Sequence, residues 1–253
     1  MSEYQVYQAF LIFSVFFAFV TYITLLFVSA PYGRHIRKGW GPTVSNRLAW
    51  VIMEVPSSVV FLITFIIGNV PKTITLIVFL GLWQAHYIHR AFIYPFMIAD
   101  GKRKMPVLII ILGLIFNLGN AYVNGRYLFS FSGGYQNSWL GSTKFIFGAI
   151  FFIAGFYINR WADELLRSLR KPGELGYKIP FGGLFNWVSC PNYLGEIIEW
   201  TGWAIATWSL PGLAFAVWTL ANLAPRAKTH HLWYRENFPQ YPSNRKALIP
   251  GIW

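Results

Sequence analysis

Apolar stretches alternate with shorter polar segments along this chain. Seven of them can be drawn, at residues 9–30, 48–70, 74–98, 106–123, 143–159, 194–208 and 210–224. The first five approach or exceed the length at which a helix crosses a bilayer, about 20 residues, and the last two are shorter. Runs this long do not resemble the alternating strands of a membrane barrel, and lipid otherwise admits only helices. The pattern therefore predicts an all-α integral membrane bundle of seven transmembrane helices, formed as a single domain over residues 1–253.

Several apolar stretches contain ionisable side chains. These are Glu54 in the second stretch, His86, Tyr87, His89 and Arg90 in the third, and Glu196 and Glu199 in the sixth. A charged side chain at the bilayer centre costs about 2.5–3.5 kcal/mol on insertion scales, so such residues usually face the bundle interior. The sequence therefore predicts a polar site buried inside the bundle.

Proline and glycine mark two further features. Pro56 and Pro95 lie within apolar stretches and are expected to kink the helices that contain them. The longest polar stretch, residues 159–193, is rich in proline and glycine, which favours ordered turns or a lid. A loop of this length in a compact protein is usually functional.

Composition and charge agree with a membrane protein. The chain is 55% hydrophobic and 12% charged, about half the charged fraction of a typical soluble domain. Its net charge of +12 is concentrated in residues 34–47, 102–104, 160–178 and 226–246, and the segments between them hold few basic residues. This alternation predicts that the N-terminus is outside and the C-terminus cytoplasmic.

The charge distribution also bears on partners and compartment. Basic loops at one membrane face fit anionic headgroups and a phosphate-bearing ligand, so no nucleic acid is expected. Cys190 is the single cysteine, which rules out an internal disulfide. The membrane is expected to be the endoplasmic reticulum in a eukaryote or the inner membrane in a bacterium.

Common soluble motifs are absent from the sequence. There is no GxGxxG after a strand, no Walker loop and no HExxH. His86 and His89 share a helix face, but no cysteine or acidic ligand accompanies them at a useful spacing. No metal site is expected.

Residues 190–200, CPNYLGEIIEW, resemble the C-terminal signature of the steroid 5α-reductase family. Further stretches match the same family in the same order: residues 54–57, 86–90, Asn159 with Asp163, 169–174, 179–185, Arg226 with 230–231 and Tyr234, and 241–250. The resemblance covers roughly residues 48–253. It implies a seven-helix membrane bundle that binds NADPH on its cytoplasmic side and reduces the 4,5 double bond of 3-oxo-4-ene steroids.

The resemblance also implies a division of labour. Substrate-facing helices are expected mainly in residues 1–125 and the NADPH-binding part mainly in residues 142–253. Glu54 and Tyr87 match the catalytic pair that addresses the 3-keto oxygen. Tyr87 can donate a hydrogen bond to the ketone, and Glu54 can position Tyr87 or, if protonated, donate directly.

The residues that match NADPH contacts of the family are mostly polar or basic. They are Arg90, Asn159, Asp163, Arg170, Tyr177, Asn192, Glu196, Arg226, His230 and Tyr234. Amide and carboxylate groups suit the nicotinamide carboxamide, and basic groups suit phosphates, including the 2′-phosphate of NADPH.

Two departures from the family pattern concern substrate and cofactor binding. Met53 stands where steroid-reducing members can carry glutamine before the catalytic glutamate. A basic residue expected early in the fourth helix is missing, and Lys102, Arg103 and Lys104 are candidates to replace it.

Other functions are compatible with parts of this sequence. A related reductase for a polyprenal, an enoyl thioester or a sterol shares parts of the C-terminal pattern. An isoprenylcysteine methyltransferase would not need Glu54 and Tyr87, and a lipid-binding or transport protein would leave the ordered motifs unexplained. Expected partners are a lipophilic steroid or enone substrate and membrane lipid, with no obligate protein partner.

Overall fold

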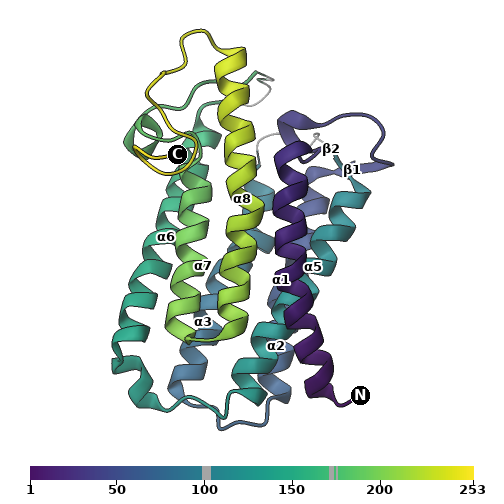
Figure 1. Ribbon diagram of the computed structural model, residues 1–253, viewed down its shortest axis with the longest axis vertical. Coiled ribbons are helices and arrows are strands. Elements are labelled where there is room, and N and C mark those ends of the chain that lie inside the picture. Colours follow the sequence, from purple (N-terminus) through teal and green to yellow (C-terminus); the bar gives the residue numbers. More distant parts are fainter. Residues whose placement is uncertain (99–103, 171–173, 175) are drawn as a thin grey trace.

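The computed structural model describes residues 1–98, 104–170, 174 and 176–253. In this part of the chain, seven helices of 15 to 28 residues run along a common direction (Figure 1). They are α1 (Glu3–Phe27), α2 (Asn46–Ile67), α3 (Ile74–Ile88), α5 (Val107–Arg126), α6 (Thr143–Ser168), α7 (Pro191–Thr207) and α8 (Leu210–Asn237). The predicted helical bundle is therefore present.

Four of these helices are long and apolar enough to cross a membrane: α1, α2, α5 with the turn that extends it, and α6. Many of their large apolar side chains are exposed on the outer surface of the bundle. An apolar surface of this kind is stable in lipid and unfavourable in water. The chain is a membrane protein on this evidence.

The helices begin at residues that cap them. The side-chain oxygens of Ser45, Thr73, Ser142 and Ser209 each accept a hydrogen bond from a backbone N–H in the first turn of α2, α3, α6 and α8. Such caps satisfy donors that the helix leaves unpaired. Pro191 occupies the first turn of α7, where its missing N–H costs nothing.

Two helices extend well beyond their apolar stretches. α6 continues to Ser168, so the first part of the predicted loop 159–193 is helical, and α8 continues to Asn237. Polar residues are compatible with a helix, and Arg167 stabilises α6 by its ion pair with Glu164. The polarity therefore marks where these helices leave the apolar layer and does not mark their ends.

The third apolar stretch is shorter as a helix than predicted. α3 ends at Ile88, a π-helical turn covers His89–Ile93, and a short helix α4 (Tyr94–Met97) follows. Pro95 stands in the first turn of α4, so it marks an interruption at this end of the stretch. Pro56 lies inside α2, and a bend there stays a prediction.

The predominantly helical structure also contains two short strands. β1 (Thr43–Ser45) pairs antiparallel with β2 (Lys104–Pro106) and joins the segments that precede α2 and α5. A second π-helical turn, Tyr127–Phe131, extends α5.

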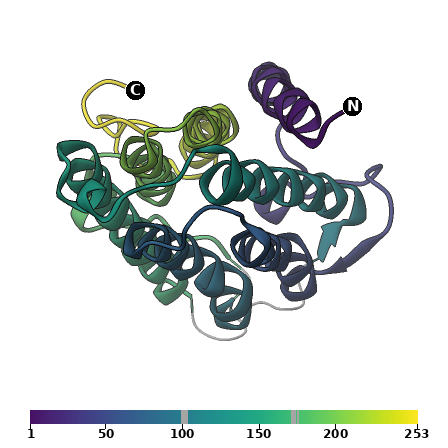
Figure 2. The same cartoon turned by 90° about the horizontal axis from the view of Figure 1, so that it is seen from below.

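The helices pack in neighbouring pairs, in which α6 lies against α7, α2 against α5, and α1 mainly against α8 at the edge of the bundle (Figure 2). Glycines allow the α6–α7 pair to approach closely. A Cβ atom at Gly155 would meet the backbone of Glu199, and one at Gly195 would meet the backbone of Asn159. Small residues serve this purpose in membrane helix pairs. An aromatic core of Phe61, Trp83, Trp200, Trp203 and neighbouring side chains fills the interior.

Candidate active site

Arg90 lies at the centre of a buried charged cluster. Its guanidinium nitrogens are 3.9 Å from Glu54 Oε1, 3.8 Å from Asp163 Oδ2 and 3.9 Å from Glu196 Oε2. The three carboxylates come from α2, α6 and α7, so one cation links three helices. Each of the four side chains is less than a fifth exposed. The π-helical turn after α3 carries Arg90 into this position.

Glu54 is held on its other side by α5. Asn117 Nδ2 donates to the Met53 carbonyl oxygen at 2.7 Å and to Glu54 Oε2 at 3.4 Å, while Ser57 Oγ donates to Asn117 Oδ1 at 2.9 Å. Met53 itself packs between α2 and α5 beside Gly113. Met53 therefore contributes to the packing of α2 against α5 behind Glu54.

Tyr87 is 3% exposed and lies beside the same helices. Its hydroxyl interacts with the side chains of Ser57 and Asn120 and experiences the charge of Glu54. The ring also packs on Trp83 and Trp200, with centroids 5.0 and 5.8 Å apart. The structure thus brings the two predicted catalytic residues into one region, each with its own set of polar partners.

Asparagines on α5 connect these partners. Asn117, Asn120 and Asn124 are spaced i, i+3 and i+7, which places them on one helix face. Asn124 Oδ1 accepts a hydrogen bond from Trp203 Nε1 at 3.0 Å. This row of asparagines was not predicted, because the fourth stretch is mainly apolar, although the spacing of the three residues is visible in the sequence.

His86 and Glu199 form a second buried polar contact, which was not predicted from the sequence. His86 Nδ1 is 2.7 Å from Glu199 Oε1, and the Glu199 side chain is fully buried. His86 precedes Arg90 by four residues, and Glu199 follows Glu196 by three. The His86–Glu199 and Arg90–Glu196 contacts therefore join the same two segments, α3 with its π-helical turn and α7. Their spacing was a usable signal, but their contact depends on how α3 and α7 pack.

Four predicted cofactor residues form one hydrogen-bonded group. Asn159 Nδ2 donates to the Asn192 carbonyl oxygen at 2.9 Å and to Glu196 Oε2 at 3.4 Å. Asn192 Nδ2 donates to Asp163 Oδ1 at 3.0 Å. Asn192 and Glu196 lie one turn apart on α7, and Asn159 and Asp163 one turn apart on α6. This group adjoins Arg90 through Asp163 and Glu196.

A second polar group lies where α8 extends past its apolar half. Arg226, His230 and Tyr234 are spaced four residues apart and share one face. Arg226 Nη2 donates to Tyr193 Oη at 3.0 Å, and Tyr193 Oη is 3.1 Å from His230 Nε2. Tyr193 follows Asn192 directly on α7, so this polar group lies beside the group formed by Asn159, Asp163, Asn192 and Glu196.

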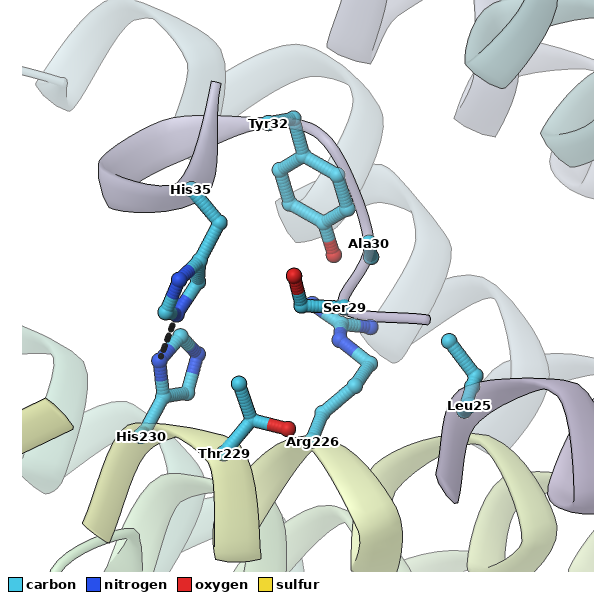
Figure 3. A pocket seen from close by; sticks show the side chains of 8 residues that line it. All are labelled: Leu25, Ser29, Ala30, Tyr32, His35, Arg226, Thr229 and His230. Atoms are coloured by element: carbon cyan, nitrogen blue, oxygen red, sulfur yellow. Dashed lines mark hydrogen bonds between the residues drawn. The ribbon is translucent and has the colours of Figure 1, made fainter. Parts of the chain in front are cut away.

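The segment after α1 closes over this part of α8. His35 Nε2 is 3.1 Å from His230 Nδ1, and the two rings stack with centroids 5.0 Å apart (Figure 3). A small pocket of about 20 Å³ lies beside them. Its lining consists of Leu25, Ser29, Ala30, Tyr32, His35, Arg226, Thr229 and His230. Burial lowers the pKa of His35, and the charges of Arg34 and Arg37 lower it further.

The remaining predicted cofactor residues, Arg170, Tyr177 and Tyr234, lie around Arg34. Its guanidinium carbon lies 4.7 Å from the ring centroids of Tyr177, Trp233 and Tyr234. The guanidinium carbon of Arg170 lies 5.3 Å from the ring centroid of Tyr177, so Tyr177 contacts both arginines. Arg34 Nη1 is buried and has no hydrogen-bond partner in the described part of the chain. Arg34 was predicted only as one of the basic residues of a loop, and its contact with these three rings was not predicted.

Lys102, Arg103 and Lys104 are the candidates to replace the basic residue that is missing from the fourth helix. Lys102 and Arg103 are outside the described residues, and Lys104 belongs to β2. Among the residues that the structure describes, no group of three or more histidine, cysteine, aspartate or glutamate side chains is arranged to hold a metal ion.

Comparisons with known proteins identify the family. The sequence model of 3-oxo-5-alpha-steroid 4-dehydrogenase matches residues 103–253. Steroid 5-alpha-reductase DET2 of Gossypium hirsutum is 44% identical over 236 residues, which cover 90% of each chain. The 3-oxo-5-alpha-steroid 4-dehydrogenase 1 of Rattus norvegicus is 44% identical over 89% of this chain and 87% of its own, and that of Homo sapiens is 42% identical over 87% and 85%. The chain therefore belongs to the 3-oxo-5-alpha-steroid 4-dehydrogenase family of oxidoreductases.

Proposed function

We propose that this protein uses NADPH to reduce the 4,5 double bond of a 3-oxo-4-ene steroid. The observation that carries the proposal is the position of Arg90. It lies within 4 Å of Glu54, from the predicted substrate side, and of Asp163 and Glu196, from the predicted cofactor side. Hydride transfer requires the two sides to adjoin. The names of the relatives support the steroid as substrate.

Tyr87 and Glu54 form the carbonyl end of the proposed site. Tyr87 donates a hydrogen bond to the 3-keto oxygen and stabilises the enolate oxygen that develops there. Glu54 holds the carbonyl end together through Asn117 and Arg90. Carbon 5 gains a hydride and carbon 4 a proton, which water supplies, so the double bond is lost and the ketone re-forms.

The residues on the other side fit NADPH. Asn159, Asn192 and Glu196 offer both donors and acceptors, as a carboxamide requires. When bound, NADPH supplies the hydride. The unpartnered Nη1 atom of Arg34 is a donor for a phosphate oxygen, and Arg226 adds a second cation.

Basic groups also support a preference for NADPH over NADH. Arg170 and Arg226 each offer a cation to an extra phosphate, whereas both ring nitrogens of His230 already contact His35 and Tyr193. Arg170→Ala should weaken NADPH binding by about 1.5–3 kcal/mol, the range for hydrogen bonds to charged groups. Lys228→Ala removes the same charge from the exposed side of α8 and should leave affinity unchanged. Equal affinity of the unmodified protein for both cofactors would refute the assignment.

The membrane arrangement proposed with this function has seven spans. α3, α7 and the apolar half of α8 join the four long apolar helices and run beside them (Figure 1). The β1–β2 region and the basic ends of α6 and α8 lie at one end of the bundle, together with the C-terminus (Figure 1). Basic loops favour the cytoplasm, so the N-terminus is outside. The endoplasmic reticulum or a bacterial inner membrane would hold this arrangement.

A panel of enones tests the reaction. Purified protein in vesicles would be given NADPH with testosterone, progesterone, a polyprenal or an enoyl thioester. The proposal expects NADPH oxidation with the two steroids and a product saturated between carbons 4 and 5. Turnover with the polyprenal or thioester alone would instead assign the protein to a related lipid reductase. Absence of turnover with every enone would overturn the proposed chemistry.

A further inference from the structure

A groove of about 450 Å³ lies between α3 with its π-helical turn and α6. Its lining consists of Ala85, Ile88, His89 and Ile93 on one side and Phe156, Tyr157 and Arg160 on the other. α3 packs on α2, and α6 packs on α7. The volume falls in the range of sites for small organic ligands.

Arg160 gives the polar part of the groove a positive charge, and His89 adds a neutral imidazole beside it. His89 experiences the charges of Arg160, Arg90 and Arg167. Asp163 and Glu164 also act on Arg160, but Asp163 is engaged by Asn192 and Arg90, and Glu164 by Arg167. Arg160 Nη1 and His89 Nε2 are buried and lack a hydrogen-bond partner among the described residues. Buried nitrogens of this kind almost always have a partner, so the groove suits an anionic acceptor.

The rest of the groove is suited to lipid. Ile88, Ile93 and Phe156 form an apolar wall. Tyr157 and Trp161 are exposed on α6, and such aromatic residues gather at the level of lipid headgroups. Arg160 is the first basic residue after an uncharged run over residues 145–158. The cationic end of the groove thus lies at headgroup level and its apolar wall at acyl-chain level.

We infer that this groove binds an anionic glycerophospholipid, with its phosphate on Arg160 and His89 and an acyl chain along Ile88 and Phe156. Basic pockets between membrane helices at the cytoplasmic side recognise anionic headgroups in this way. The inference uses residues that the proposed reaction does not, so either can hold without the other.

Lipid retention measured by native mass spectrometry tests the inference. The full chain would be reconstituted in vesicles of phosphatidylcholine with phosphatidylglycerol and then extracted in detergent. Phosphatidylglycerol should be retained in preference to phosphatidylcholine. Arg160→Gln should weaken its retention about fivefold, the effect of one basic residue near a lipid headgroup. Arg160→Lys should restore most of it.

Three controls keep the test decisive. Lys228→Gln removes an exposed charge elsewhere and should not change retention. Ala85→Trp fills the groove while leaving both basic residues, and should displace the lipid. Circular dichroism and elution as a single species in detergent report whether each variant has folded. Equal retention of the two lipids, full retention by Ala85→Trp, or displacement of phosphatidylglycerol by inorganic phosphate would each overturn the inference.

Discussion

Arg90 bears much of the electrostatic organisation of the site, because its three carboxylate neighbours come from different helices. Arg90→Gln should lower the free energy of unfolding by about 3–5 kcal/mol, the cost of leaving buried charges without their partner. Chemical denaturation in detergent measures this. Lys178→Gln is a matched control, because Lys178 pairs with Glu174, both side chains are more than a third exposed, and such pairs contribute about 0–1 kcal/mol. Equal losses in both variants would show that the Arg90 cluster is not a buried network.

Residue types and spacing predicted which polar side chains would be buried, but not every pairing among them. Glu54, Arg90 and Glu196 stood out because charge is rare in apolar stretches. The contact between His86 and Glu199, and the position of Arg34 over aromatic rings, depend on segments far apart in the chain. A single sequence has no signal for such contacts unless the packing is known.

At the scale of helices, the predicted cofactor site depends on the close α6–α7 approach. Gly155→Ala should lower the free energy of unfolding by about 1–3 kcal/mol, because a methyl group there meets the backbone of Glu199. It should also weaken NADPH binding, since Asn159 follows one turn later. Gly119→Ala on α5 meets open space and should be neutral or slightly stabilising. A neutral Gly155→Ala would contradict close packing as the factor that positions the site.

Apolar stretches predicted the helices better than their ends. Hydropathy locates the part of a helix that lies in lipid, whereas α6 and α8 continue through polar sequence. The π-helical turn at His89–Ile93 was not predictable from the apolar pattern, because the apolar residues continue through it. That turn nevertheless carries Arg90 to its carboxylates.

For the whole molecule, the testable quantity is topology. Single cysteines at the exposed positions Lys38, Lys178 and Ser138, in a Cys190→Ala background, can be labelled in intact vesicles. The proposed arrangement expects Lys38→Cys and Lys178→Cys to react from the cytoplasmic side and Ser138→Cys from the other. Labelling of Lys38→Cys and Lys178→Cys from opposite sides would exclude the seven-span arrangement.

The central claim for the whole molecule is a division into a steroid end and a cofactor end that meet at Arg90. Tyr87→Phe tests it most directly, because it keeps the ring and removes only the hydrogen-bond donor. The measurement is turnover of testosterone together with NADPH affinity in the same preparation. Turnover should fall by about 10²–10³, as for the loss of one preorganised donor, while NADPH affinity stays unchanged. Near-normal turnover, or loss of NADPH binding, would contradict the account.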